Sequence, residues 1–182
     1  MRIAVLTALA SVSLVACGQN ATSTNNNVAE NSTNSVEVTE SAATPAPAPA
    51  TKEEAMKVMH ERHEGMEQIG KSTKTIKRQL DSSAPDVAEI QKAATTIADL
   101  AAKSPNWFPQ GTGPDVGKTG AKAEIWQNQK DFAARLAVFQ RAAVAFNAAA
   151  ASGDMPATKA RYADLIGTCN SCHDKYRMDM HH

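Results

Sequence analysis

The chain has 182 residues, and its 19 lysines and arginines balance 19 aspartates and glutamates, which gives a formal charge of zero. This length suits one domain with an additional segment, and the neutral balance argues against a nucleic-acid-binding protein, which normally carries a basic excess. Only 4% of the residues are aromatic, and alanine is abundant. The composition therefore favours helices and argues against a β-sandwich or barrel. No apolar run reaches the roughly 20 residues that a membrane-spanning helix needs.

Residues 1–16 are predicted to be an export signal, because a short charged start is followed by an apolar stretch too short to span a bilayer. The segment 14–18 (Leu-Val-Ala-Cys-Gly) resembles a bacterial lipobox, in which the cysteine is acylated and becomes the new N-terminus. Cys17 is therefore the predicted lipidation site. The alternative is an ordinary signal peptide that is cut after Ala16, with Cys17 left as a free thiol.

Residues 17–51 are predicted to be the lipidated cysteine and a disordered tether. The segment is rich in Asn, Ser, Thr and Ala, ends in Ala-Pro repeats, and shows no hydrophobic periodicity. Such a tether would hold a domain clear of the lipid headgroups. We expect a periplasmic protein with a lipid anchor in a bacterial membrane, and Gly18 after the cysteine slightly favours the outer membrane over the inner one.

The folded part, residues 52–182, is predicted to be all-α, an antiparallel up-down-up-down four-helix bundle. Apolar residues recur at three- and four-residue spacing, which is typical of amphipathic helices. The four helical segments expected from this spacing are 52–80, 85–103, 121–151 and 155–178.

Local signals mark where these helices begin and where they are interrupted. Thr51 and Glu54 form a predicted capping box before the first helix, and Pro85 suits the first turn of the second. The first helix should bury a face that includes Met56 and His63. Residues 104–120 are predicted to be a loop from their Pro and Gly content; because the loop is long, it should be functional or packed by its own aromatic residues.

The sequence Cys169-Asn170-Ser171-Cys172-His173 carries the chemistry of the chain. Its C-x-x-C-H spacing is typical of covalent c-type haem attachment. Cysteines three residues apart share one face of a helix, so both thiols can react with the vinyl groups of one haem. His173 can then bind the iron through a neutral imidazole nitrogen.

Three other interpretations of the cysteine pair compete with haem attachment. A thioredoxin-type redox pair would need a neighbouring strand, and none is expected. A zinc site would need a second pair of ligands, for which the terminal His181 and His182 are poor candidates. A structural disulfide is compatible with an oxidising compartment.

Several stretches together resemble the cytochrome c′ family and its low-spin, methionine-ligated relatives. They are the C-terminal CNSCHDKYR, the loop and helix segment WFPQGTGPDVGKTGAKAEIW, and RHEGMEQIGK in the first helix. The resemblance covers essentially residues 52–180. It implies a four-helix bundle that carries one covalently bound haem c.

The resemblance also implies roles for two residues of the first helix. Arg62 matches an arginine that lies near a haem propionate, for which a guanidinium is well suited. Met66 matches the position over the distal face of the iron, where a methionine thioether is the sixth ligand in the low-spin relatives. A methionine in a helix is otherwise usually core filler, and His63 is a rival ligand on a similar face.

The function expected from these residues is that of a non-enzymatic electron carrier, with iron held by His173 and Met66 and with periplasmic or membrane redox proteins as partners. The alternative is a five-coordinate haem protein that binds or sequesters NO or CO. A peroxidase-like activity is the third reading, and no distal acid–base pair favours it. The resemblance allows a homodimer, and the membrane would be reached through the lipid on Cys17.

Overall fold

The computed structural model describes residues 46–179, so the predicted export signal, Cys17, most of the predicted tether and residues 180–182 lie outside the described part. Helices account for most of this part, and no strand is found in it apart from one isolated bridge between Ala121 and Arg177. The elements are α1 (Lys52–Leu80), α2 (Val87–Lys103), the 3-10 helix η1 (Ser104–Trp107), α3 (Glu124–Gln127), α4 (Gln129–Ser152) and α5 (Met155–Tyr176).

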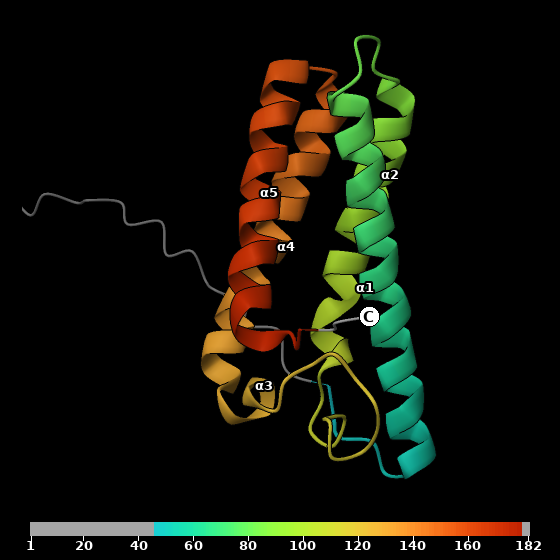
Figure 1. The fold of residues 1–182 in the computed structure, drawn as a ribbon, viewed down its shortest axis with the longest axis vertical. Coiled ribbons are helices and arrows are strands. Elements are labelled where there is room, and N and C mark those ends of the chain that lie inside the picture. Colours follow the sequence, from blue (N-terminus) through green and yellow to red (C-terminus); the bar gives the residue numbers. More distant parts are fainter. Residues whose placement is uncertain (1–45, 180–182) are drawn as a thin grey trace, which may run out of the picture. The chain divides into compact units, whose positions relative to one another are not determined.

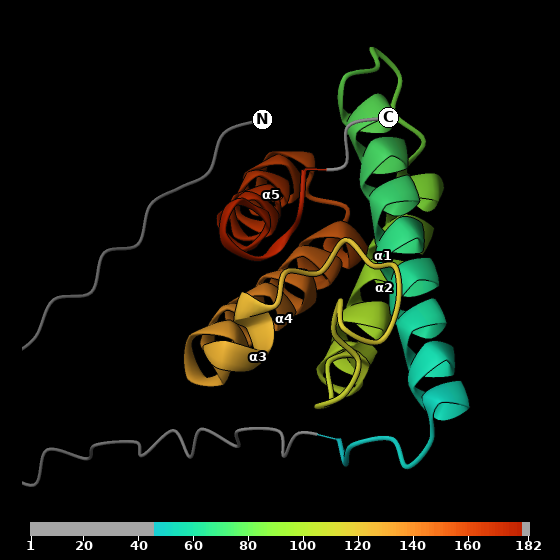
Figure 2. The same cartoon turned by 60° about the horizontal axis from the view of Figure 1, so that its bottom comes forward.

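The four long helices form an antiparallel up-down-up-down bundle, as the sequence predicts (Figure 1). α1 packs on α2, α2 on α4, and α4 on α5. α1 and α5 stand apart over much of their length, as both views show (Figures 1 and 2). No helix within residues 46–179 has the length and apolar character needed to cross a membrane.

The first residues of α1 and α2 are determined by the N-cap residues that precede them. The predicted capping box of α1 is confirmed, because the Glu54 amide donates to Thr51 Oγ1 over 3.1 Å and the Thr51 amide donates to the Glu54 carboxylate over 3.2 Å. The predicted start of α2 at Pro85 is wrong. Asp86 is the N-cap and its carboxylate accepts from the Glu89 amide over 3.0 Å, which leaves Pro85 outside the helix.

The single helix expected over 121–151 is broken into α3 and α4. The break lies at Asn128, whose φ of −122° and ψ of 47° are not helical. The Trp126 indole donates to the Pro109 carbonyl over 2.8 Å and thereby ties α3 to the preceding loop. No glycine or proline lies at the break, so the sequence gives no local signal for it.

The last helix ends at Tyr176, two residues before its predicted end. Arg177 is extended (φ −105°, ψ 133°), and the chain pairs with the loop instead of continuing the helix. The Lys122 amide donates to the Tyr176 carbonyl over 2.9 Å, and the Met178 amide donates to the Gly120 carbonyl over 2.8 Å. These bonds fasten the end of α5 to the loop that precedes α3.

The bundle core follows the predicted apolar positions in α2, α4 and α5. Ile97, Phe146 and Leu165 are fully buried. In α1, the predicted positions Met59, Ile69, Ile76 and Leu80 are buried, whereas the predicted Met56 is 43% exposed and His63 is exposed. The buried face also contains Arg62 and Gly65, which hydrophobic periodicity does not select. Both of these residues contact the loop that packs against α1.

Gly65 provides a test of that packing. A Cβ atom at Gly65 would lie 2.4 Å from Cη2 of Trp107, which is 6% exposed. We expect Gly65→Ala to lower the free energy of unfolding by about 1–3 kcal/mol, because the indole would have to move out of a filled site. The matched control is Gly167→Ala in α5, where a Cβ meets nothing within 4 Å. It should stabilise the helix by roughly 0.5–1 kcal/mol. Equal effects of the two substitutions in chemical denaturation would contradict this account.

Candidate functional site

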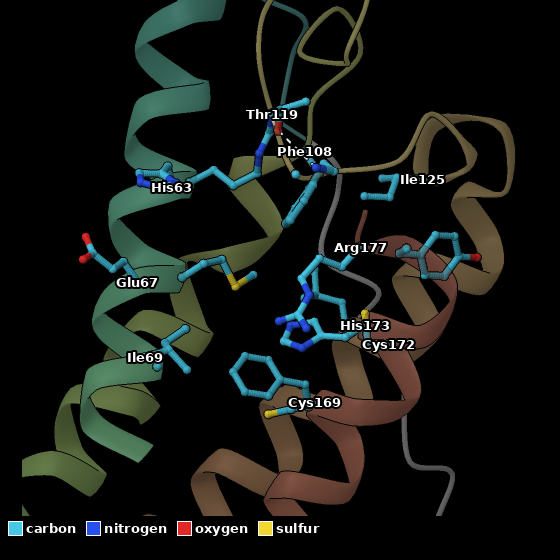
Figure 3. A pocket seen from close by; sticks show the side chains of 18 of the residues that line it. His63, Glu67, Ile69, Phe108, Thr119, Ile125, Cys169, Cys172, His173 and Arg177 are labelled. Carbon is cyan, nitrogen blue, oxygen red and sulfur yellow. Dashed lines mark hydrogen bonds between the residues drawn. The ribbon is translucent and has the colours of Figure 1, made fainter. Parts of the chain in front are cut away.

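A cavity of about 610 Å³ lies between α1 and α5, where these two helices stand apart. Its volume is within the range of roughly 300–1,000 Å³ that is typical of small-molecule sites. Figure 3 shows side chains from α1, from the loop and from α5 around it. Its apolar lining consists of Met59, Met66, Ile69, Phe108, Ala121, Ile125, Phe132, Leu136, Phe139 and Ile166.

The attachment sequence lies on the cavity side of the last turns of α5. Cys169, Cys172 and His173 are all half-buried and all line the cavity. Figure 3 shows the three side chains together at the end of this helix. Both cysteines are free thiols. The predicted grouping of the two thiols with one imidazole is therefore present.

The protonation of these groups suits haem attachment. Burial raises the pKa of the Cys169 and Cys172 thiols, so both are in the S–H form that adds across a vinyl group. Burial, and then the positive charge of Arg177, lowers the pKa of His173. The imidazole is neutral at neutral pH and keeps a nitrogen lone pair for iron.

The competing interpretations of the cysteine pair find less support. Residues 46–179 contain no cluster of three or more His, Cys, Asp or Glu side chains that could hold a metal ion, and His181 and His182 lie outside these residues. A thioredoxin-type pair would sit beside a strand, and the described part of the chain contains none.

Arg62 is buried at the loop end of the cavity, with only 4% of its surface exposed. One terminal nitrogen donates to the Trp107 carbonyl (3.0 Å) and to Thr112 Oγ1 (3.2 Å). The other donates to the Thr112 carbonyl (3.0 Å) and to Thr119 Oγ1 (3.0 Å). The carbon of the guanidinium also lies 5.2 Å from the centre of the Phe108 ring. Arg62 therefore holds the loop in place over this end of the cavity.

All four acceptors of Arg62 are neutral, so its charge is not balanced by a carboxylate among them. Burial lowers the pKa of Arg62 to about 10, which leaves the group a cation at neutral pH. A buried cation favours an anionic partner. The two carboxylates of a haem meet this requirement, and together with the free thiols, the neutral imidazole and the apolar lining this shows that the cavity fits the cofactor.

Met66 and His63 occupy different environments on α1. Met66 is half-buried and lines the cavity. His63 is exposed at the rim, and Figure 3 shows its ring directed away from His173. This placement does not favour His63 as a second ligand. His60, the other histidine of α1, lies 3.3 Å from Glu64 on the solvent side.

The prediction that the loop is packed by its own aromatic residues is confirmed. Trp107 is buried, and the Phe108 ring lies 4.7 Å from the Phe132 ring, centre to centre. The polar contacts of the loop were not predicted as functional. Thr112 and Thr119 accept from Arg62, and the only local signal for them is their position between glycines and basic residues in the loop.

Asp131 is a further residue that the sequence analysis did not identify. It lies in the first turn of α4 and accepts hydrogen bonds from side chains of α4 and α5. The pair with Arg135 has the i,i+4 spacing of a local helix pair, whereas the contacts with Lys175 and Tyr176 depend on how α4 and α5 pack, and no pattern along the chain indicates them.

Known proteins resemble this chain over the whole bundle. The family model that matches residues 57–177 is described as "Cytochrome C'". A cytochrome c′ of Pararhodospirillum photometricum is 33% identical over 116 residues, which is 64% of this chain and 92% of the relative. A solved cytochrome c′ described by its ligand-controlled dimer dissociation is 30% identical, with a TM-score of 0.64 and coverage of 72% of this chain and 100% of that one. The nitric oxide complex of a leucine-to-isoleucine variant of cytochrome c prime from Alcaligenes xylosoxidans is 27% identical, with a TM-score of 0.62 and the same coverage.

These matches correct the functional prediction. A six-coordinate electron carrier, with iron held by His173 and Met66, was expected, and this main reading is wrong. Cytochromes c′ typically hold five-coordinate, high-spin haem and bind NO or CO, which agrees with the alternative reading. The expectation came from the match of Arg62 and Met66 to the low-spin relatives, and a methionine on an apolar helix face is equally suited to packing.

Proposed function

Since the chain belongs to the cytochrome c′ family, we propose that it binds NO or CO at a five-coordinate iron and acts as a ligand-binding protein and not as an enzyme. The family carries one covalently attached haem c with iron. What this cofactor supplies is an iron with one free coordination position, at which a diatomic gas can bind.

Each role in this proposal belongs to a residue of the cavity. Cys169 and Cys172 attach the haem through their sulfurs, and His173 is the proximal ligand. Arg62 provides positive charge for a haem carboxylate at the loop end. Met66 forms part of the wall opposite α5 without binding the iron. These roles are proposals that rest on the placement of the side chains around one cavity.

The observation that carries the proposal is the nature of the wall opposite His173. α1 contributes the apolar Met59, Met66 and Ile69 to this wall, and it also contributes polar side chains to the lining, of which Arg62, His63, Thr73 and Lys74 can donate hydrogen bonds. The apolar part of the wall favours neutral CO and NO over charged ligands, because a charged ligand would lose its hydration on entry.

The gas-binding proposal is tested by titrating the dithionite-reduced holoprotein with CO under argon and recording the absorption spectrum. The expected result is a change in the absorption spectrum that saturates with CO concentration and shows a single set of isosbestic points, because one haem with one free coordination position binds one CO. The control is a cytochrome c in which a methionine and a histidine occupy the two axial positions of the iron, and its spectrum should not respond to CO. A spectrum that stays unchanged at saturating CO would contradict the proposal.

We further propose that the domain works outside the cytoplasm and that Cys17 anchors it to a membrane. The apolar stretch before the Leu-Val-Ala-Cys-Gly sequence supports this proposal. Two or more acyl chains on one cysteine would give a stable anchor, whereas one chain would bind reversibly. A periplasmic domain on a tether could intercept NO or CO close to the membrane.

A further inference from the structure

A cluster of charged and hydroxyl groups lies on the outer side of the attachment turn, between α4 and α5. One carboxylate oxygen of Asp131 accepts from the Tyr176 hydroxyl over 2.5 Å, from Lys175 Nζ over 2.9 Å and from Arg135 Nε over 3.0 Å. Arg135 uses a second nitrogen to donate to the Ser171 carbonyl over 3.1 Å. Four side chains and one backbone carbonyl are thus joined through Asp131.

The cluster holds α5 on both sides of the proximal histidine. Ser171 lies two residues before His173, inside the C-x-x-C sequence, and Tyr176 lies three residues after it. His173 is therefore on a helical turn whose two ends are tied to α4. Because an imidazole is carried by its backbone and two side-chain torsions, fixing the turn restricts where its ring can point.

Aromatic packing makes the Tyr176 contact rigid. Tyr176 is 3% exposed, and its ring meets Phe132 edge to face with centres 5.3 Å apart. Phe132 follows Asp131 in α4, so neighbouring residues of one helix hold the hydroxyl and the ring of the same tyrosine. The packing of the ring therefore restricts where the Tyr176 hydroxyl can lie, and Tyr176 itself lines the cavity.

The electrostatics of the cluster suit a permanent contact. The hydroxyl of Tyr176 and the cations Lys175 and Arg135 hold the pKa of Asp131 well below its usual range, so the carboxylate is ionised at neutral pH. The side chain of Asp131 is 42% exposed, and ion pairs at such positions add little to stability. The arrangement is thus better suited to fixing a geometry than to stabilising the fold.

We propose that Asp131 is a positioning residue for His173, which orients the proximal imidazole by bracing the attachment turn through Arg135 and Tyr176. The inference deepens the proposed function and rests on it, because the orientation of the proximal ligand influences how strongly the free position of the iron binds a gas. Replacing residues that contact a metal ligand but do not bind the metal commonly changes the affinity or activity of the metal site. Asp131 acts one contact farther out, so a smaller effect is expected.

The test uses the ferric holoprotein and the hyperfine-shifted ¹H NMR resonances of the His173 ring. These shifts depend on the orientation of the ring and on its bond to iron, and they do not depend on global stability. The variants are Asp131→Asn, which keeps the size of the side chain and removes its charge, and Tyr176→Phe, which keeps the ring packing and removes the hydroxyl. The matched control is Asp164→Asn in α5, whose carboxylate only pairs with Arg161 at the surface. CO affinity of the ferrous protein is measured alongside.

The expected result is that both cluster variants shift the His173 resonances and change the CO dissociation constant by about three- to tenfold, while Asp164→Asn changes neither. Unchanged resonances in both cluster variants, with or without a lower melting temperature, would overturn the positioning role. If Asp131→Asn does not fold, Tyr176→Phe decides alone. If the wild-type protein fails to bind CO but the cluster variants still shift the His173 resonances, the gas-binding proposal is wrong and the positioning role of Asp131 is supported.

Discussion

Replacing both Cys169 and Cys172 with serine is expected to abolish covalent haem in the purified protein. The two thiols are the free cysteines of the described chain, and both line the cavity beside His173. A serine hydroxyl does not form the thioether that holds the cofactor, so the haem would be released on denaturation. Each single substitution should leave one attachment and a reduced haem content.

The measurement is haem-dependent staining of denatured protein after electrophoresis, combined with intact mass. Ser171→Ala is the matched control, because Ser171 lies between the two cysteines and its exposed hydroxyl contacts only the Thr168 carbonyl (3.1 Å). It should retain full staining. Covalent haem in the double variant would show that the attachment chemistry is assigned to the wrong residues.

Arg62→Met is expected to have the second large effect, on the stability of the loop and of the whole bundle. The substitution removes four hydrogen bonds to Trp107, Thr112 and Thr119. Each buried acceptor left without a donor costs about 1–3 kcal/mol. Because part of the loop can rehydrate, we expect a total loss of about 3 kcal/mol in the free energy of unfolding.

The loss should be concentrated in the loop, so amide hydrogen exchange between residues 107 and 119 should accelerate more than exchange in α2. Arg62→Lys should give an intermediate loss, because an ammonium keeps the charge but lacks the two-pronged geometry of the guanidinium. The control Arg161→Met removes an exposed pair with Asp164 and should change stability by no more than about 0.5 kcal/mol. Similar losses for Arg62→Met and Arg161→Met would show that the loop does not depend on the buried guanidinium.

Much of the fold could be predicted from the sequence because its signals are local. The capping box at Thr51 and Glu54 and the apolar spacing of the long helices are recorded within a few residues of where they act. The attachment sequence is also local, since five consecutive residues carry both thiols and the imidazole. The fold class and the cofactor followed from such signals, and both are confirmed.

The features that could not be predicted depend on contacts between distant segments. The break at Asn128 accompanies the bond of Trp126 to the Pro109 carbonyl, which is 17 residues away. The buried face of α1 includes Arg62 because a loop 45 to 57 residues later supplies its acceptors. Asp131 reaches Tyr176 across 45 residues. Periodicity ranks a residue by its own polarity, so it cannot identify a polar residue that is buried by a distant partner.

Met66 illustrates a different limit, because the sequence predicted it to be the sixth ligand of the iron, whereas the structure shows only that it lines the cavity. A methionine that lines an apolar wall is compatible with packing and with ligation, and the sequence does not separate the two. The family match favours an open position at the iron. Only the coordination state of the iron itself distinguishes these possibilities.

The most direct test of the central claim is the visible and near-infrared magnetic circular dichroism of the ferric holoprotein at neutral pH. An iron held by His173 alone among the side chains of the protein should give a high-spin spectrum, without the near-infrared band of a methionine–iron bond. This is the result that we predict. A low-spin spectrum with that band would show that Met66 occupies the sixth position, and it would contradict the assignment of this protein as an open-site binder of NO or CO.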